Sequence, residues 1–477
     1  MPASKSFAPK AAVLALLLGL SAPGEALALY NDAKWDVRVT DGITYGQGRV
    51  DGGATWKDLE LTLYEPVDNP DPLKPAIVFV HGGGFTGGSR YSMAGYGNHY
   101  AERGYVAVSI TYRLLGENPT ADPDYDFWPT NPGLSPAVHA AAVDAARAVR
   151  WLRANAGAYG IDPNFVFAGG ISAGGITVGN LAIAGPEGTE AYTQELPGDV
   201  PLAINNPGES SKVQAVLDYC GGAGPALPDP TDAPMLLIHT VGDGIVPVLL
   251  PDLLSGWYGN APAPIEYYRL PGGSHCSFLG GLVDGLSVND VSTRFLDRMV
   301  WEVPTAPMLS QRLLLKDSPT KPERRKLVFN AQATVGSEAL TVPAPGSDGA
   351  PTEVGMMVEV YASTGDPDDY ARFHLPAEGW SVVVSGTKVK YRYSDKRQTW
   401  GAVKTAKLQD GKLKIVAKGA AIPALSGAPH GAFSVRTRIG TKTPWCATAT
   451  ASSVDSDSRF LGQRQVLPEN CADRPPL

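Results

Sequence analysis

Between residues 56 and 301 the chain alternates short apolar runs with segments of helical spacing. The runs are four to eight residues long and suit strands that are covered on both faces. They occupy residues 75–80, 105–111, 164–168, 213–219, 234–240 and 265–270. Helical spacing of apolar residues extends from Pro136 to Ala156, over 176–184 and over 291–301. Strands that alternate with helices predict an α/β domain with a mostly parallel sheet.

The segment before these runs and the segment after them follow a period of two. Residues 56–64 (W-K-D-L-E-L-T-L-Y) alternate and predict an edge strand. Beyond residue 325 the same alternation recurs with frequent Pro and Gly, as in Met357–Tyr361 and Lys388–Tyr393. We therefore predict an α/β domain over 29–302, a Pro-rich and charged linker over 303–324, and a β-sandwich over 325–477.

The first 28 residues have the pattern of a signal peptide. Lys5 and Lys10 precede an apolar core at Ala11–Leu20, and Ala26-Leu27-Ala28 matches a cleavage site. The apolar core is too short to span a bilayer as a stable anchor. We expect cleavage after Ala28 and a secreted or periplasmic protein; an uncleaved membrane tether is the alternative.

Charge and cysteine content narrow the class of protein further. The formal net charge is −8, which gives no signature of nucleic-acid or anionic-membrane binding. Four cysteines in an exported chain predict two disulfide bonds. Cys446 and Cys471 both lie near the C-terminus and are expected to pair, which leaves Cys220 to pair with Cys276.

A serine between two glycines marks the centre of the α/β domain. Ser172 stands in Gly170-Ile171-Ser172-Ala173-Gly174, after an apolar run and before a helical pattern. This is the pattern of a nucleophile elbow, a strand-to-helix turn so tight that neighbouring residues have no room for a Cβ. The helix that follows presents unpaired N–H groups to any anion formed at the serine.

A serine hydroxyl needs a base, and the base needs a group that fixes its tautomer. Two further strands end at residues of these types: Asp243 follows the run ending at Thr240, and His275 follows the run ending at Leu270. We predict Ser172 as the nucleophile, Asp243 as the acid and His275 as the base. Asp252 and Asp232 are the alternatives to Asp243, and His239, inside a predicted strand, is interpreted as a core residue.

Three consecutive glycines follow the predicted strand 75–80, in His81-Gly82-Gly83-Gly84-Phe85. Backbone N–H groups in such a loop can approach a substrate oxygen closely, so Gly83, Gly84 and Ala173 are the expected oxyanion donors. Phe85 and Trp128 are candidates for an aromatic wall around an acyl group, whereas Tyr112 is expected to pack in the core. Cysteine and histidine spacing indicates no metal site, and we expect no cofactor.

With these motifs in hand, residues 40–302 resemble the α/β-hydrolase carboxylesterases of the hormone-sensitive-lipase and feruloyl-esterase-like groups. The resemblance implies a serine esterase that works through an acyl-enzyme, with Ser172, His275 and Asp243 in the roles given above. The chain departs from the hormone-sensitive-lipase pattern, because the segment before Trp35 is too short for a helical cap and Ile171 replaces an acidic residue.

These departures favour an open, shallow site rather than one for a lipid-like substrate. An exported esterase with an attached β-sandwich suggests a polymer-linked ester, such as acylated polysaccharide or a polyester. The β-domain is a candidate contact to that polymer or to a cell surface. A serine peptidase of the same fold and a non-catalytic binding or adhesion protein are the alternatives.

Overall fold

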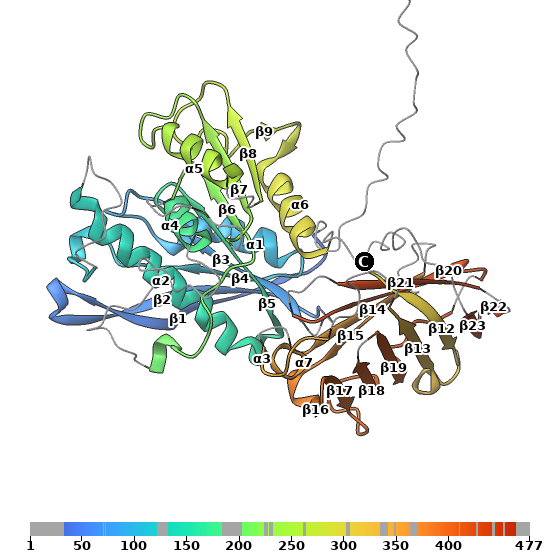
Figure 1. The fold of residues 1–477 in the computed structure, drawn as a ribbon. Helices are drawn as coiled ribbons and strands as arrows, with labels where there is room; N and C mark the ends of the chain where they lie inside the picture. The colour runs from blue at the N-terminus through green and yellow to red at the C-terminus, as the bar shows by residue number, and fades with distance from the viewer. Residues whose placement is uncertain are drawn as a thin grey trace, which may run out of the picture.

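The computed structural model describes two packed units (Figure 1). It covers residues 33–69, 71, 73–121, 132–183, 203–223, 228, 232–260, 264–301, 306–333, 342–347, 350–362, 370–409, 411–425, 428–440, 444–451 and 454–463. The predicted signal peptide, Trp128 and Cys471 lie outside these residues, so the expectations placed on them stay predictions.

The first unit is built on an eight-stranded sheet of order β1-β2-β4-β3-β5-β6-β7-β8. Its strands are β1 (Val37–Val50), β2 (Thr55–Pro66), β3 (Lys74–Val80), β4 (Val106–Ile110), β5 (Ile161–Ile171), β6 (Val216–Tyr219), β7 (Met235–Thr240) and β8 (Ile265–Leu270). Strand β2 runs antiparallel to β1 and β4, and all pairs from β4 to β8 are parallel. This strand order and direction define an α/β-hydrolase fold, as the sequence predicted.

Both faces of the sheet are buried, which explains the continuous apolar runs. Side chains alternate between the faces along each strand: Val78 of β3 lies in one core and its neighbour Ile77 in the other. Helices α2 (Ser135–Ala154), α4 (Ala173–Ala182) and α5 (Leu249–Asn260) contribute to the first core. Helices α1 (Ala94–Ala101) and α6 (Val288–Trp301) contribute to the second, and α3 (Ala156–Tyr159) follows α2.

The second unit consists of β-sheets that enclose a core of their own. One sheet has the order β11-β21-β20-β14-β15 and the other β16-β17-β18-β19-β13-β12-β23-β22. The strands are β11 (Ala306–Pro307), β12 (Leu309–Lys316), β13 (Lys326–Gln332), β14 (Met356–Ala362), β15 (Tyr370–Leu375), β16 (Trp380–Ser385), β17 (Lys388–Ser394), β18 (Val403–Gln409), β19 (Lys412–Lys418), β20 (Ala432–Arg438), β21 (Trp445–Thr450), β22 (Val454–Ser456) and β23 (Arg459–Gln463). The β-sandwich expected here is therefore present.

The structure differs from the sequence interpretation over the predicted linker, residues 303–324. Strand β12 lies inside it and pairs with both β13 and β23. Leu313 and Leu315 on this strand are fully buried in the core of the second unit. Prolines and charges on both sides of this short apolar stretch gave the whole segment the composition of a linker and hid the strand.

The two units meet at the edge of the first sheet where its parallel strands begin. Arg372 on β15 donates a hydrogen bond from Nη1 to Asp71 Oδ2, 2.7 Å away, just before β3. The guanidinium carbon of Arg438 on β20 lies 3.9 Å from the centroid of the Phe165 ring on β5. An ion pair and a cation–π contact therefore join the second unit to the end of the sheet opposite the strand C-termini.

A buried cluster of charges holds the segment after β4 against α2. Asp144 on α2 accepts hydrogen bonds from Arg113 at 2.9–3.1 Å and from Arg147 at 2.6 Å. All three side chains are almost completely buried. Because the two guanidinium groups are buried away from water, they depend on partners within the protein, and both share the Asp144 carboxylate.

Asp144→Asn keeps the size of the side chain but removes the charge that both arginines face. We expect it to lower the free energy of unfolding by about 3–5 kcal/mol, the usual cost of leaving a buried charge unpaired. Urea denaturation followed by circular dichroism measures the change. Asp36→Ala, at an exposed position, is the control and should change stability by less than about 0.5 kcal/mol. A stability of Asp144→Asn equal to that of the control would contradict this account of the cluster.

Candidate active site

Ser172 stands at the turn between β5 and α4 in a backbone conformation that few residues adopt. Its φ is 57° and its ψ is −117°. Such a conformation costs roughly 1–3 kcal/mol and persists only where the surroundings impose it. Here the Ser172 N–H donates to the Tyr219 carbonyl of β6 at 2.8 Å, and the Ser172 carbonyl accepts from the Ile176 N–H at 2.9 Å. The turn is thus bonded on both sides.

The glycines beside Ser172 are required by close backbone packing. A Cβ on Gly170 would collide with the Gly174 carbonyl, and a Cβ on Gly174 would collide with the Val80 and His81 carbonyls. The turn, its helix and the end of β3 are therefore in direct backbone contact. This is the geometry of a nucleophile elbow.

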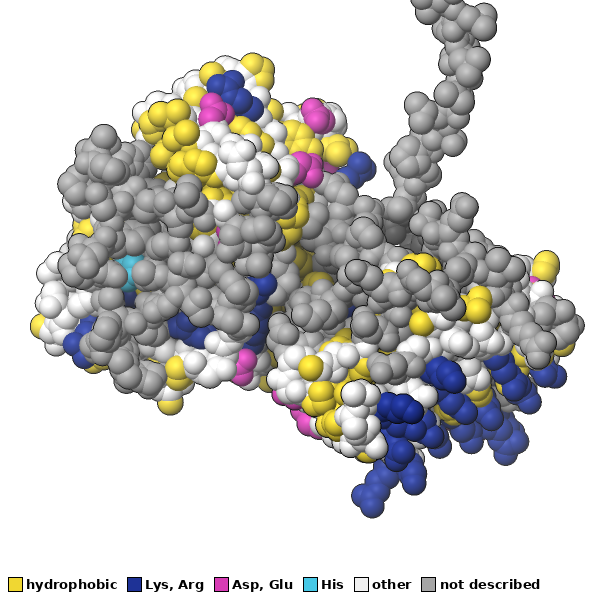
Figure 2. Space-filling view, in the orientation of Figure 1, with side chains coloured by type: hydrophobic (Ala, Val, Ile, Leu, Met, Phe, Trp, Pro, Cys, Tyr) yellow, Lys and Arg dark blue, Asp and Glu magenta, His cyan; other side chains and the backbone are white. Residues whose placement is uncertain are grey.

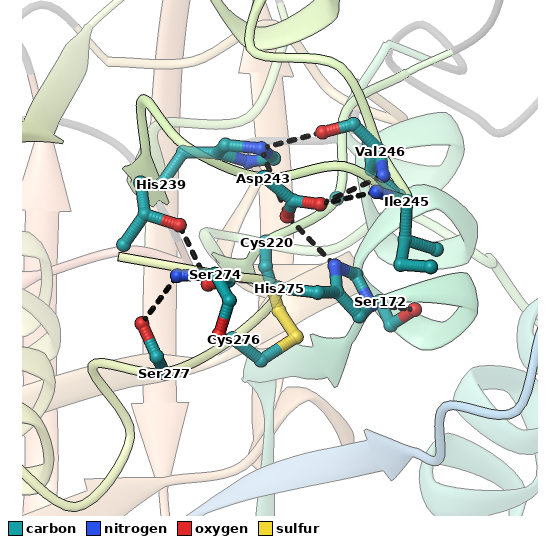
Figure 3. The surroundings of a disulfide bond; sticks show 12 residues. Ser172, Cys220, His239, Asp243, Ile245, Val246, Ser274, His275, Cys276 and Ser277 are labelled. Carbon is teal, nitrogen blue, oxygen red and sulfur yellow. Dashed lines mark hydrogen bonds and ion pairs between the residues drawn. A yellow bond between two sulfur atoms is a disulfide. The ribbon is translucent and has the colours of Figure 1, made fainter. Parts of the chain in front are cut away.

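Ser172, His275 and Asp243 form a continuous hydrogen-bonded chain (Figure 3). His275 Nε2 is 2.7 Å from Ser172 Oγ, and His275 Nδ1 is 2.7 Å from Asp243 Oδ2. Because Nδ1 faces a carboxylate, it carries the proton, which leaves Nε2 to accept the serine proton. The three residues come from the ends of β5, β7 and β8, which are brought together at one edge of the sheet.

Asp243 is buried, but its carboxylate accepts several hydrogen bonds. Its Oδ1 accepts hydrogen bonds from the N–H groups of Ile245 at 2.8 Å and Val246 at 2.9 Å. Burial raises the pKa of Asp243, and the hydrogen bonds from His275, Ile245 and Val246 more than offset this, so its pKa lies below the ordinary value. Asp243 is therefore ionised at neutral pH. The alternative Asp252 instead binds Arg269 and Tyr267.

The structure also brings a residue to the site that sequence interpretation had assigned to the core alone. His239 is fully buried on β7, and its Nε2 lies 3.0 Å from the Val246 carbonyl and 3.3 Å from Asp243 Oδ2. Burial lowers the pKa of His239, only partly offset by these acceptors, so the ring is neutral with its proton on Nε2. The spacing of four residues between His239 and Asp243, across a strand end, was the signal in the sequence.

The loop after β3 places glycine backbone beside the nucleophile. A Cβ built on Gly82 would lie 3.3 Å from the Ser172 Cβ. Gly83 and Gly84 have φ values of 125° and 60°, which favour glycine. Among the hydrogen bonds between described residues, none uses the N–H of Gly83, Gly84 or Ala173 as donor. These three groups are thus available to a ligand.

The buried rings of His81 and Tyr112 pack against the start of this loop. The His81 ring stacks on Tyr112 with a centroid distance of 4.3 Å, and the Tyr112 hydroxyl donates to the His81 carbonyl at 3.1 Å. His81 Nδ1 lies 2.7 Å from the Gly82 carbonyl. Tyr112 packs as predicted. Phe85 is only 3% exposed and packs near Tyr112, and its place in an aromatic wall around the substrate stays a prediction.

A disulfide bond ties the histidine loop to the strand beside the elbow. Cys276, directly after His275, is bonded to Cys220, directly after β6, as predicted. Both half-cystines have positive φ, 53° and 51°. Within the described residues, Cys220, Cys276 and His275 are also the one group with metal-ligand atoms close together. Because the two sulfur atoms are bonded to each other, neither is a thiolate that could bind a metal. The His275 imidazole is then the one ligand left in this group. Cys446 is disulfide-bonded as well.

Part of the chain is similar in sequence to known esterases. Residues 57–195 match the model of the carboxylesterase family. Esterase LipC of Mycobacterium tuberculosis is 30% identical over 34% of this chain and 33% of its own length, and esterase FE4 of Myzus persicae is 35% identical over 30% of this chain and 24% of its own. Thermogutta terrifontis esterase 2, solved after phosphonylation by cyclosarin, aligns with 56% of this chain and 95% of its own at 23% identity and a TM-score of 0.42.

Residues 57–195 are thus similar to the carboxylesterase family, and they lie in an α/β-hydrolase fold that is followed by a β-sandwich. The chain's matched segment spans a third or less of the length of these two curated relatives. The narrower assignment to the hormone-sensitive-lipase or feruloyl-esterase-like groups stays a prediction. In the part of the chain that the structure describes, no helix is both long and apolar enough to cross a membrane.

Replacing Cys220 and Cys276 by serine should destabilise the first unit by about 2–4 kcal/mol, because the bond closes a long loop in the unfolded chain. The separation of the two cysteines is 56 residues. Thermal unfolding of the double variant and the parent measures the difference, and mass mapping of unreduced peptides checks the bond itself. Recovery of Cys220 and Cys276 as free thiols in the parent protein would refute it.

Proposed function

We propose that the protein is a serine carboxylic-ester hydrolase. The observation that supports this most directly is the chain of two 2.7 Å hydrogen bonds from Ser172 through His275 to Asp243. A hydroxyl, an imidazole and a carboxylate in this order are the means by which a serine is activated for acyl transfer. The match of residues 57–195 to the carboxylesterase family is independent support.

In the first half of the proposed reaction, Ser172 Oγ attacks the ester carbonyl carbon while His275 Nε2 takes the hydroxyl proton. The carbonyl oxygen becomes an oxyanion and accepts hydrogen bonds from the N–H groups of Gly83, Gly84 and Ala173. Each such donor lowers the barrier by about 2.7–4 kcal/mol because it is fixed before the charge develops. The ester C–O bond then breaks, and His275 returns the proton to the leaving alcohol.

In the second half, water replaces the alcohol. His275 takes a proton from water as the oxygen attacks the acyl-enzyme carbonyl, and the same three N–H groups bind the new oxyanion. Collapse releases the carboxylic acid and returns the proton to Ser172. Asp243 stays ionised throughout and stabilises the imidazolium form of His275 in both steps.

His239 has a positioning role in this scheme. Its Nε2–H faces the Val246 carbonyl and Asp243 Oδ2 together. It thereby holds the loop that supplies the Ile245 and Val246 donors and the carboxylate that they bind. A displaced Asp243 would leave His275 free to rotate away from Ser172, so His239 acts on the reaction through Asp243.

We further propose that the ester is linked to a polymer, such as acylated polysaccharide or a polyester, and that the protein acts after export. A β-sandwich joined to an α/β-hydrolase domain supports the first point, because such a unit offers a second surface for an extended ligand. The disulfide bond between Cys220 and Cys276 supports the second, since such bonds persist in oxidising compartments.

Ser172→Ala should lower kcat for a chromogenic short-chain ester by about a million-fold, because the nucleophile is lost while the fold is kept. Ser381→Ala, at an exposed serine of β16, is the matched control and should retain full activity. Mass spectrometry during turnover should detect an acyl adduct on a peptide containing Ser172 in the parent only. Undiminished turnover by Ser172→Ala would rule out the mechanism, and faster cleavage of an aminoacyl amide than of the ester would indicate a peptidase.

His239→Leu should lower kcat by roughly 10- to 100-fold with little change in KM, because it disturbs the orientation of Asp243 rather than the binding of substrate. His239→Gln can place an N–H near the position of Nε2 and should restore most of the activity. Steady-state kinetics on both variants, with thermal unfolding to verify folding, make the comparison. Equal kcat for folded His239→Leu and the parent would exclude the positioning role.

A further inference from the structure

The exposed face of the eight-stranded sheet in the second unit is strongly basic. Strands β17, β18, β19 and β13 contain three, two, three and one Lys or Arg, and no Asp or Glu. Figure 2 shows dark blue side chains gathered along this unit. The protein as a whole carries a net charge of −8. The positive charge of these strands is therefore opposite in sign to the charge of the whole protein.

Successive side chains of a strand point to opposite faces of the sheet, and most of these cations lie on the same face. On β17, Tyr391 and Tyr393 point into the core, and the residues between and before them point outward. We call the outward cations of these four strands the cationic face. It consists of Lys326, Lys388, Lys390, Arg392, Lys407, Lys412, Lys414 and Lys418.

The strand register sets like charges directly opposite one another. Arg392 pairs with Lys407, and Lys407 pairs with Lys414 on the next strand. A second row joins Lys418 to Lys326 and then to Lys316 on β12. Side chains at such positions start about 5 Å apart, and like charges there destabilise a sheet. Among the described residues, none of these cations takes part in an ion pair. The sheet therefore carries a repulsion that an anionic ligand would relieve.

The remaining side chains of the face indicate the kind of anion. Amide groups stand beside the cations: Asn330 is opposite Lys414, and Gln409 is opposite both Lys390 and Lys412. Amides of this kind hydrogen-bond hydroxyl groups. Single-stranded nucleic acid would require aromatic side chains for base stacking, but the tyrosines of β17 face the core. A membrane surface would require an extended cluster of exposed apolar side chains. Val328 and Val416 between the two rows are partly buried, and the exposed apolar side chains described near the face are Val383 and Val384 on the edge strand β16 and Trp400.

We propose that the cationic face binds an acidic polysaccharide, a chain whose sugar units carry carboxylate groups. Carboxylates would meet the lysines and arginines, and sugar hydroxyls would meet the amides between them. Neighbouring strands are about 4.8 Å apart and outward residues along a strand about 6.6 Å apart, so the face offers a regular array to a regularly charged polymer. This proposal deepens the suggested action on a polymer-linked ester, yet binding does not depend on Ser172.

The test measures binding of the full-length protein to soluble polygalacturonate by isothermal titration calorimetry at low and high salt. Binding should be detectable at low salt and should weaken steeply as salt is added, because it depends on charge. Dextran, a neutral polysaccharide that has hydroxyl groups but neither carboxylates nor esters, should not bind. Hydrolysis of a chromogenic ester is measured in parallel, so a failed binding proposal is distinguished from a failed esterase proposal.

The triple variant Arg392→Gln, Lys407→Gln and Lys414→Gln removes one row of the face. It should weaken binding roughly 100-fold at low salt, leave hydrolysis of the small ester unchanged, and raise or preserve the melting temperature because repulsion is relieved. Lys34→Gln with Arg38→Gln, two exposed cations of the first unit, is the control and should bind like the parent. Equal binding by the triple variant and the parent would overturn the proposal. Tighter binding to anionic vesicles or DNA than to polygalacturonate would overturn it as well, in favour of those partners.

Discussion

The structure depends on backbone packing at the C-terminal ends of β3, β5 and β6. Carbonyl groups from β3 approach α4 so closely that Gly174 has no room for a Cβ. The hydrogen bond from the Ser172 N–H to the Tyr219 carbonyl fixes the same turn from the other side. Ser172 is held in its strained conformation because these contacts leave it no alternative. The strain is thus supported by sheet packing rather than by the side chains of the site.

The supports of the site come from both sides of the sheet edge. On one side, Asp144 holds Arg113 against α2, and the neighbouring Tyr112 stacks on His81 at the start of the glycine loop. On the other, the Cys220–Cys276 bond joins the end of β6 to the histidine loop. Each of these contacts lies just behind a group that is proposed to touch the substrate. A shift in either support would change the distance between the oxyanion donors and the nucleophile.

Sequence reasoning was sufficient where a feature is local in the chain. The buried strands, the elbow glycines and the order of Ser172, Asp243 and His275 all appear as short patterns, and the Cys220–Cys276 bond followed from the number of cysteines. Features that depend on spatial neighbours were missed. The contact of His239 with Asp243 requires the path of the loop after β7. Strand β12 is recognised as a strand from its pairing with β13 and β23, which the sequence of the segment alone does not show.

Charge is the clearest case of information that composition conceals. A net charge of −8 argues against an anionic partner when it is averaged over the chain. The alternation within β17, β18, β19 and β13 places basic residues on one side of a sheet, where their fields add. The average and the local arrangement therefore point in opposite directions, and only the register of the strands distinguishes them.

The position of the junction between the two units determines how far the second unit lies from Ser172. Asp71 lies just before β3 and Phe165 lies in the first half of β5, whereas Ser172 directly follows the last residue of β5. Counted from Phe165, the seven residues to Ser172 separate the junction from the serine by roughly 23 Å at about 3.3 Å per residue. The described strands of the second unit lie beside the end of the first sheet where β5 begins, away from the end where β5 leads into α4 (Figure 1). A molecule held by both units at once must be a long one.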